Sequence, residues 1–175
     1  MMTLVIGGAA SGKSEYAEGL VLASACEKRI YIATMEPFDD ECLRRIEKHR
    51  RMRAEKRFET LECYTDLASV TVPPDSVVLL ECMSNLCANE MYSPHGRGDR
   101  AAEVILRGVE HLKEQCGDLV VVSNEVFSGG SRYEGDTLRY LKLLGRVNRR
   151  LAAMADNVCE VVCGVPVYYK GKEPC

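Results

Sequence analysis

The sequence has 175 residues, of which 46% are hydrophobic and 28% charged, and its formal net charge is −3 at pH 7. These values predict one soluble globular domain over residues 1–175, with enough chain to bury a single core. They argue against a dedicated nucleic-acid-binding protein, because such proteins usually carry a strong positive charge.

Membrane insertion and secretion are also not expected. No apolar run approaches the roughly 18 residues that span a bilayer, and no signal peptide precedes the first expected strand. The nine cysteines form no C-x-x-C pair, and most lie in apolar runs, as reduced core thiols do. We therefore expect a cytoplasmic protein without stable membrane insertion.

Strands and helices are expected to alternate along the chain. Continuous apolar runs such as SVVLLEC and LVVVS are typical of strands buried on both faces of a sheet. The expected strands are residues 3–6, 29–34, 58–63, 76–82, 119–123 and a closing pair within 157–169, and the expected helices are residues 14–25, 39–57, 100–116 and 136–156. Residues 92–99 and 128–136 have loop composition. This order predicts an α/β fold with a largely parallel central sheet flanked by helices.

A phosphate-binding loop is predicted where the first strand meets the first helix. The stretch GGAASGKS at residues 7–14 fits G-x-x-x-x-G-K-[ST], so its backbone N–H groups would converge on phosphate oxygens at a helix N-terminus. A plain glycine turn is the weaker interpretation, because the motif has the required strand before it and helix after it. In this pattern the lysine reaches the β- and γ-phosphates and the hydroxyl holds Mg²⁺. The predicted nucleotide-binding residues are Gly7, Gly8, Ala9, Ala10, Ser11, Gly12, Lys13 and Ser14, with Lys13 also catalytic.

A second magnesium ligand is expected at the carboxyl end of another buried strand. Glu81 ends one such strand, and Asn124 and Glu125 end another. Glu81 is favoured as the partner of Ser14, because a carboxylate avoids such surroundings unless it has a partner. Glu125 is equally well explained as an exposed loop residue or a helix cap. The chain has no N-K-x-D motif of regulatory GTPases, and its size favours a small-molecule kinase.

One histidine lies inside the most basic run of the chain. Residues 44–57 hold eight basic and two acidic side chains around His49, which suits a small anionic ligand or, equally, a solvated helix face. His49 follows Ile46 by three positions, so one interpretation is a half-buried histidine that completes an apolar stripe. The other is a nucleophile, because neighbouring cations disfavour a charged imidazole and would stabilise a departing pyrophosphate.

The ordered combination of GGAASGKS, YIATMEPFDDECLRRIEKHRRMR, FETLE, VVLLEC, VVVSNEV and GRVNRRLAAMADNVCEVVCGVPV resembles the adenosylcobinamide kinase/adenosylcobinamide-phosphate guanylyltransferase family. The resemblance covers nearly the whole chain. It implies a bifunctional enzyme of cobalamin biosynthesis and salvage that phosphorylates adenosylcobinamide with ATP or GTP. The enzyme then transfers GMP from GTP to adenosylcobinamide phosphate through a guanylyl-histidine. A homotrimer and Mg²⁺ dependence are also implied.

The resemblance assigns further residues to the site. Its histidine falls on His49, and its other nucleotide contacts fall on Ala33, Thr34, Met35, Arg50, Arg51, Met52, Arg53, Glu62 and Glu81. This chain departs from the family after SNEV, where FSGGSRYEGD replaces a G-x-G-I-V-P type loop. That departure keeps open one alternative, a kinase-only homologue that acts on another small hydroxylic acceptor. A second alternative is a non-catalytic GTP-binding module, against which the intact Lys13, Ser14 and Glu81 weigh.

Overall fold

A seven-stranded sheet forms the centre of the computed structural model, which describes residues 1–37, 43–44, 47, 56–127 and 133–172. The strand order is β3-β2-β4-β5-β1-β6-β7. The strands are β1 Met2–Gly7, β2 Lys28–Ala33, β3 Glu59–Glu62, β4 Ser76–Glu81, β5 Asp118–Asn124, β6 Asn157–Val162 and β7 Val165–Lys170. Neighbouring strands pair in parallel except β6 and β7, which form an antiparallel hairpin at one edge. The prediction of a largely parallel α/β sheet is confirmed.

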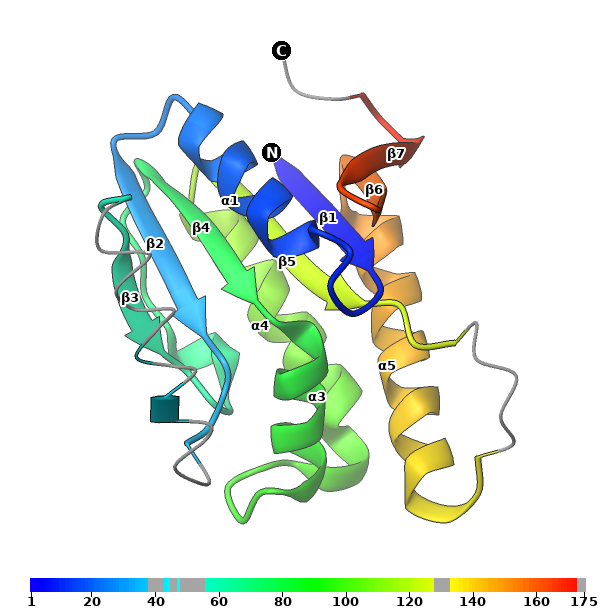
Figure 1. Ribbon diagram of the computed structural model, residues 1–175. Coiled ribbons are helices and arrows are strands. Elements are labelled where there is room, and N and C mark those ends of the chain that lie inside the picture. The colour runs from blue at the N-terminus through cyan, green and yellow to red at the C-terminus, as the bar shows by residue number, and fades with distance from the viewer. Residues whose placement is uncertain (38–42, 45–46, 48–55, 128–132, 173–175) are drawn as a thin grey trace.

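Helices cover both faces of the sheet (Figure 1). They are α1 Lys13–Ala23, α3 Met83–Tyr92, α4 Ala101–Gln115 and α5 Gly135–Met154, with the 3₁₀ turns η1 Leu67–Ser69 and η2 Gly98–Arg100. Helix α1 lies against one face, and α3, α4 and α5 lie against the other. None of the helices in the described ranges combines the length and apolar character that a bilayer crossing requires.

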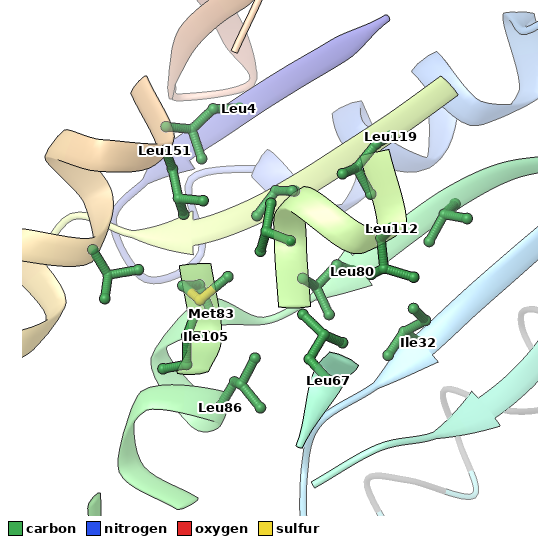
Figure 2. Packing of buried hydrophobic residues seen from close by; sticks show 14 of the residues in the cluster. Leu4, Ile32, Leu67, Leu80, Met83, Leu86, Ile105, Leu112, Leu119 and Leu151 are labelled. Carbon is green, nitrogen blue, oxygen red and sulfur yellow. The ribbon is translucent and has the colours of Figure 1, made fainter. Parts of the chain in front are cut away.

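The central strands β4 and β5 contain continuous apolar runs because each face of the sheet has its own core. In β4, Val78 and Leu80 belong to the core under α3, α4 and α5, whereas Val77 and Leu79 belong to the core under α1. Figure 2 shows the larger core, in which Leu80 lies among side chains from both the sheet and the helices. Strand side chains alternate between faces, so burial of both faces requires a continuous apolar run.

Two helices differ from the predictions. Helix α3 was not predicted, and the helix expected over residues 39–57 does not include Lys56 and Arg57. Leu43, Arg44 and Glu47 are helical, but Lys56 and Arg57 form a turn with Arg57 at φ 58°. A left-handed residue cannot continue a right-handed helix, which excludes Arg57 from the expected helix.

The cysteines are only partly core residues. All seven in the described ranges are free thiols, but Cys163, in the turn between β6 and β7, is exposed. Burial raises the pKa of the Cys63 and Cys116 thiols to about 11, so both remain protonated at neutral pH. The prediction of reduced thiols fits these residues, whereas the prediction of a core position is wrong for Cys163.

Candidate functional site

The phosphate loop connects the end of β1 to the start of α1, as its motif predicts. Gly12 has φ 89° and directly precedes the helix, and a side chain there would place its Cβ 3.2 Å from the Cα of Gly164. Glycine is therefore required at this position by backbone conformation and by space. Ala10 also has a positive φ of 56°, a conformation that costs a non-glycine residue about 1 kcal/mol or more.

The C-terminal hairpin braces this loop. The backbone N–H of Gly164 donates to the carbonyl of Ser11 at 2.8 Å. The hydroxyls of Tyr16 on α1 and Tyr168 on β7 lie 2.7 Å apart in a second link. These contacts come from the β6–β7 hairpin, which lies on the side of β1 that faces away from β5.

Three polar side chains of the loop have different surroundings. The ammonium of Lys13 donates to the carbonyl of Gly8 at 3.1 Å, which holds the side chain over the loop. The hydroxyl of Ser14 donates to Glu81. The Ser11 hydroxyl is buried without a hydrogen-bond partner among the described residues. A buried hydroxyl normally has a partner, so Ser11 is an available donor to a phosphate oxygen.

Glu81 is the acid that the fold brings to the phosphate loop. One carboxylate oxygen accepts from Ser14, and the other accepts from the Tyr31 hydroxyl at 3.2 Å. The Tyr31 side chain, only 4% exposed, packs edge-on against Phe58 with the ring centroids 6.1 Å apart. The carboxylate is therefore held in one orientation by partners on α1 and β2.

The other two candidates for the acidic position are engaged elsewhere. The Asn124 amide donates to the Ser84 hydroxyl at 2.6 Å. Glu125 accepts from the backbone N–H of Phe127 at 2.8 Å, and its own N–H donates to the carbonyl of Gly7 at 3.0 Å. Of the alternatives that the sequence left open, Glu81 is the one in contact with Ser14.

The end of β2 lies between two acidic residues on the neighbouring strands. In the sheet register Ala33 is paired with Glu62 of β3 on one side and with Glu81 of β4 on the other. Glu62 is exposed, and its carboxylate accepts from the Tyr64 hydroxyl at 2.9 Å. Met35 follows as a half-buried residue. Ala33, Glu62 and Glu81 therefore lie side by side at the carboxyl ends of their strands.

Thr34 is fully buried, and its polar groups bind protein atoms. Its hydroxyl donates to the carbonyl of Cys82 at 2.9 Å and accepts from the N–H of Cys82 at 2.8 Å. Its carbonyl accepts from the Asn89 amide at 2.8 Å. Thr34 thus joins the end of β2 to the end of β4 and to α3, which keeps the predicted nucleotide contacts in register.

The predicted histidine and the four residues after it lie outside the described part of the chain; they are His49, Arg50, Arg51, Met52 and Arg53. The chain that follows them is anchored. Lys56 forms an ion pair with Glu18 of α1, and its carbonyl accepts from the Arg29 guanidinium at 3.2 Å.

Three residues of this network were missed by the sequence analysis. Tyr31 orients Glu81, Asn89 holds Thr34, and Ser84 receives Asn124. Tyr31 could have been found from the sequence. It lies three residues before the end of the strand expected over residues 29–34, and a buried phenol there needs a hydrogen-bond partner. Asn89 and Ser84 had no such signal, because helix α3 was not predicted.

The arrangement fits a magnesium ion that is shared with a nucleotide. Ser14 and Glu81 supply two adjacent oxygens, and Mg²⁺ in phosphate-transfer sites takes one or two protein oxygens together with phosphates and water. No group of three or more histidine, cysteine or acidic side chains within the described part of the chain could hold a metal by itself. The donor set is thus that of a phosphate-dependent metal site.

Two solved structures share the fold. One is an ATPase domain, which superposes with a TM-score of 0.51 at 12% identity, over 91% of this chain and 68% of that one. The other is the flagellar accessory protein FlaH from Methanocaldococcus jannaschii, which superposes with a TM-score of 0.52 at 10% identity, over 98% and 78%. At these identities the likeness concerns the fold alone.

Sequence comparison gives closer relatives. The bifunctional adenosylcobalamin biosynthesis protein CobU of Escherichia coli (strain K12) is 36% identical, and that of Salmonella typhimurium is 34% identical, each over 97% of this chain and 100% of the relative. CobP of Pseudomonas aeruginosa is 32% identical over 98% and 99%. The family model for cobinamide kinase / cobinamide phosphate guanyltransferase matches residues 3–169. This chain therefore belongs to the cobinamide kinase / cobinamide phosphate guanyltransferase family.

Proposed function

We propose that this protein catalyses two successive reactions on one corrinoid. It phosphorylates the aminopropanol hydroxyl of adenosylcobinamide with ATP or GTP, and it then transfers GMP from GTP to adenosylcobinamide phosphate. The observation that carries the proposal is the family match, which spans residues 3–169 and therefore includes both the phosphate loop and the His49 segment. A kinase for another acceptor and a non-catalytic GTP-binding module are not favoured.

In the kinase reaction the acceptor hydroxyl oxygen attacks the γ-phosphorus, and the bond to the β–γ bridging oxygen breaks to release ADP or GDP. The loop N–H groups and the Lys13 ammonium stabilise negative charge on the β- and γ-phosphates as that bond breaks. Mg²⁺, when bound through Ser14 and Glu81, neutralises charge on the same phosphates. The contacts of Glu81 with Ser14 and Tyr31 support this assignment, because they orient the carboxylate in advance.

In the guanylyltransferase reaction the His49 imidazole attacks the α-phosphorus of GTP, and pyrophosphate leaves. A phosphate oxygen of adenosylcobinamide phosphate then attacks the same phosphorus and releases the imidazole, which gives adenosylcobinamide-GDP. Arg50, Arg51 and Arg53 are the cations proposed to stabilise the departing pyrophosphate. We further propose a cytoplasmic homotrimer, in line with the family resemblance.

The test is covalent labelling by GTP that carries ³²P at the α-phosphate. The purified protein is incubated with this GTP and Mg²⁺, denatured and separated from free nucleotide. We expect label that survives alkali and is lost in acid, as a phosphoramidate is, and that is absent in His49→Ala. His111→Ala is the matched control, because His111 lies on α4 and should leave the label unchanged. Absence of label in a parent protein that still binds GTP would refute the guanylyltransferase half of the proposal.

A further inference from the structure

A large cavity opens at the carboxyl ends of β1 and β5, beside the phosphate loop but separate from it. Its volume is about 810 Å³. Ile6 of β1, Val126 and Phe127 after β5, and Leu138 and Leu141 of α5 contribute its apolar lining. None of its lining residues belongs to the loop over residues 7–14. We refer to this cavity as the α5 groove.

One hydrogen bond shows that the groove lies next to the phosphate loop. The N–H of Glu125, which lines the groove, donates at 3.0 Å to the carbonyl of Gly7, the first residue of the phosphate loop. The groove therefore lies beside the start of the phosphate loop, since Ile6, which lines the groove, directly precedes Gly7. A molecule in it would lie next to the phosphate loop without occupying residues 7–14.

The groove gathers exposed apolar side chains. Val126 is 38% exposed, Phe127 46%, Tyr133 41% and Leu138 37%. A second group of exposed apolar residues lies on the C-terminal hairpin and includes Tyr169, which is 69% exposed. The first group lines this cavity, whereas none of the hairpin residues contributes to its lining. Exposed apolar surface that is also concave is typical of a ligand site.

The walls of the groove are fixed to the sheet. Asn148 of α5, which is 9% exposed, accepts from the Ser123 hydroxyl at 2.6 Å. The Glu125 carboxylate accepts from the N–H of Phe127. The Phe127 ring lies 3.5 Å from the point where a Cβ on Gly145 would stand, so the ring rests on the backbone of α5. The site is therefore pre-formed, which lowers the entropy cost of binding.

The charges at the groove select for a ligand with oxygen atoms around an apolar body. Lys142, Arg146 and Arg149 contribute cationic groups, against the single acid Glu125. Lysine and arginine donate hydrogen bonds and accept none, so they suit amide carbonyl and phosphate oxygens. Phe127 and Tyr133 offer aromatic faces and edges to an extended ring.

We propose that the α5 groove holds the corrin ring of the acceptor in both reactions. This inference rests on the proposed function. A corrinoid has a broad apolar ring edged by amide side chains, and after the first reaction it also carries a phosphate, which matches the apolar lining and the three cations. Phe127 and Tyr133 are the aromatic residues that this site would offer to the ring.

The test measures binding of the acceptor and of the nucleotide separately. Adenosylcobinamide is titrated into Phe127→Ala and Leu138→Ala by equilibrium dialysis, with the corrinoid followed by its visible absorbance. We expect each variant to raise the corrinoid Kd by about tenfold or more, because an apolar ring contact is lost. The Kd for a fluorescent GTP analogue should stay within about twofold. Tyr169→Ala, which removes a more exposed aromatic residue from the hairpin, should change neither.

Two outcomes would overturn the inference. One is an unchanged corrinoid Kd in both groove variants. The other is a change of sedimentation coefficient in Phe127→Ala, which would make a second copy of this chain the occupant. Failure of the proposed function looks different, because the parent protein itself would then neither bind nor phosphorylate adenosylcobinamide.

Discussion

Replacing Thr34 with valine removes one hydroxyl from the point where β2, β4 and α3 meet, at nearly constant shape. Two hydrogen bonds to Cys82 are lost. The carbonyl of Cys82 keeps a second donor, the backbone N–H of Leu86 at 3.2 Å, whereas its N–H loses the hydroxyl that accepted from it. The lost hydroxyl bond costs about 1 kcal/mol and the buried unpaired N–H about 1–3 kcal/mol. We therefore expect the free energy of unfolding to fall by about 3 kcal/mol.

Urea denaturation at one fixed protein concentration measures this change, because any self-association would otherwise shift the midpoint. For a chain of this size the same loss lowers Tm by about 6–12 °C. Thr71→Val is the control, since Thr71 is exposed and the same chemical change there should alter stability by less than about 0.5 kcal/mol. If Thr34→Val unfolds at the same urea concentration and with the same m-value as Thr71→Val, the bonds to Cys82 do not hold the strands together.

Two further predictions concern packing and pH. Alanine at Gly108 would place its Cβ 2.6 Å from the Cβ of Leu67, so it should destabilise by about 1–3 kcal/mol. Alanine at Gly19, also helical but with open space around it, should stabilise by about 0.5–1 kcal/mol in the same urea assay, and equal effects would refute the packing argument. The Met2 N–H donates to Asp156 at 2.7 Å and holds the pKa of that carboxyl below its usual value. A depressed native pKa stabilises the fold above the unfolded pKa of about 3.9, and this contribution is lost as pH falls further. Asp156→Asn should therefore flatten the fall of Tm between about pH 4 and 2, and an unchanged slope would contradict this assignment.

Elements whose apolar pattern reflects burial could be predicted from the sequence. The strands of the central sheet and helices α1, α4 and α5 were predicted to within a few residues of their ends. The strand expected over residues 58–63 is β3, which lies at the edge of the sheet. The motif over residues 7–14 predicted the loop between β1 and α1, because the conformation of this loop depends on local residues such as Gly12.

Helix α3 could not be predicted in this way because its buried face is partly polar. Ser84, Asn89 and Glu90 are all buried there. Each is satisfied by an atom that is distant in sequence: Glu90, for example, accepts from the backbone N–H of Asp66 at 2.6 Å. A hydrophobic pattern cannot reveal a helix whose inner side chains bind strand ends and loops, since those partners come together only in the fold.

The brace between the C-terminal hairpin and the phosphate loop has a consequence for how the protein is made. Tyr16 and Tyr168 are 152 residues apart in the chain, and Ser11 and Gly164 are separated by a similar length. The loop therefore leaves the ribosome well before the hairpin that supports it. Contacts of such long range form only after a large loss of chain entropy. A nascent chain therefore carries the complete phosphate motif long before it can hold that motif in a binding conformation, and nucleotide can stabilise only a chain whose last hairpin has closed.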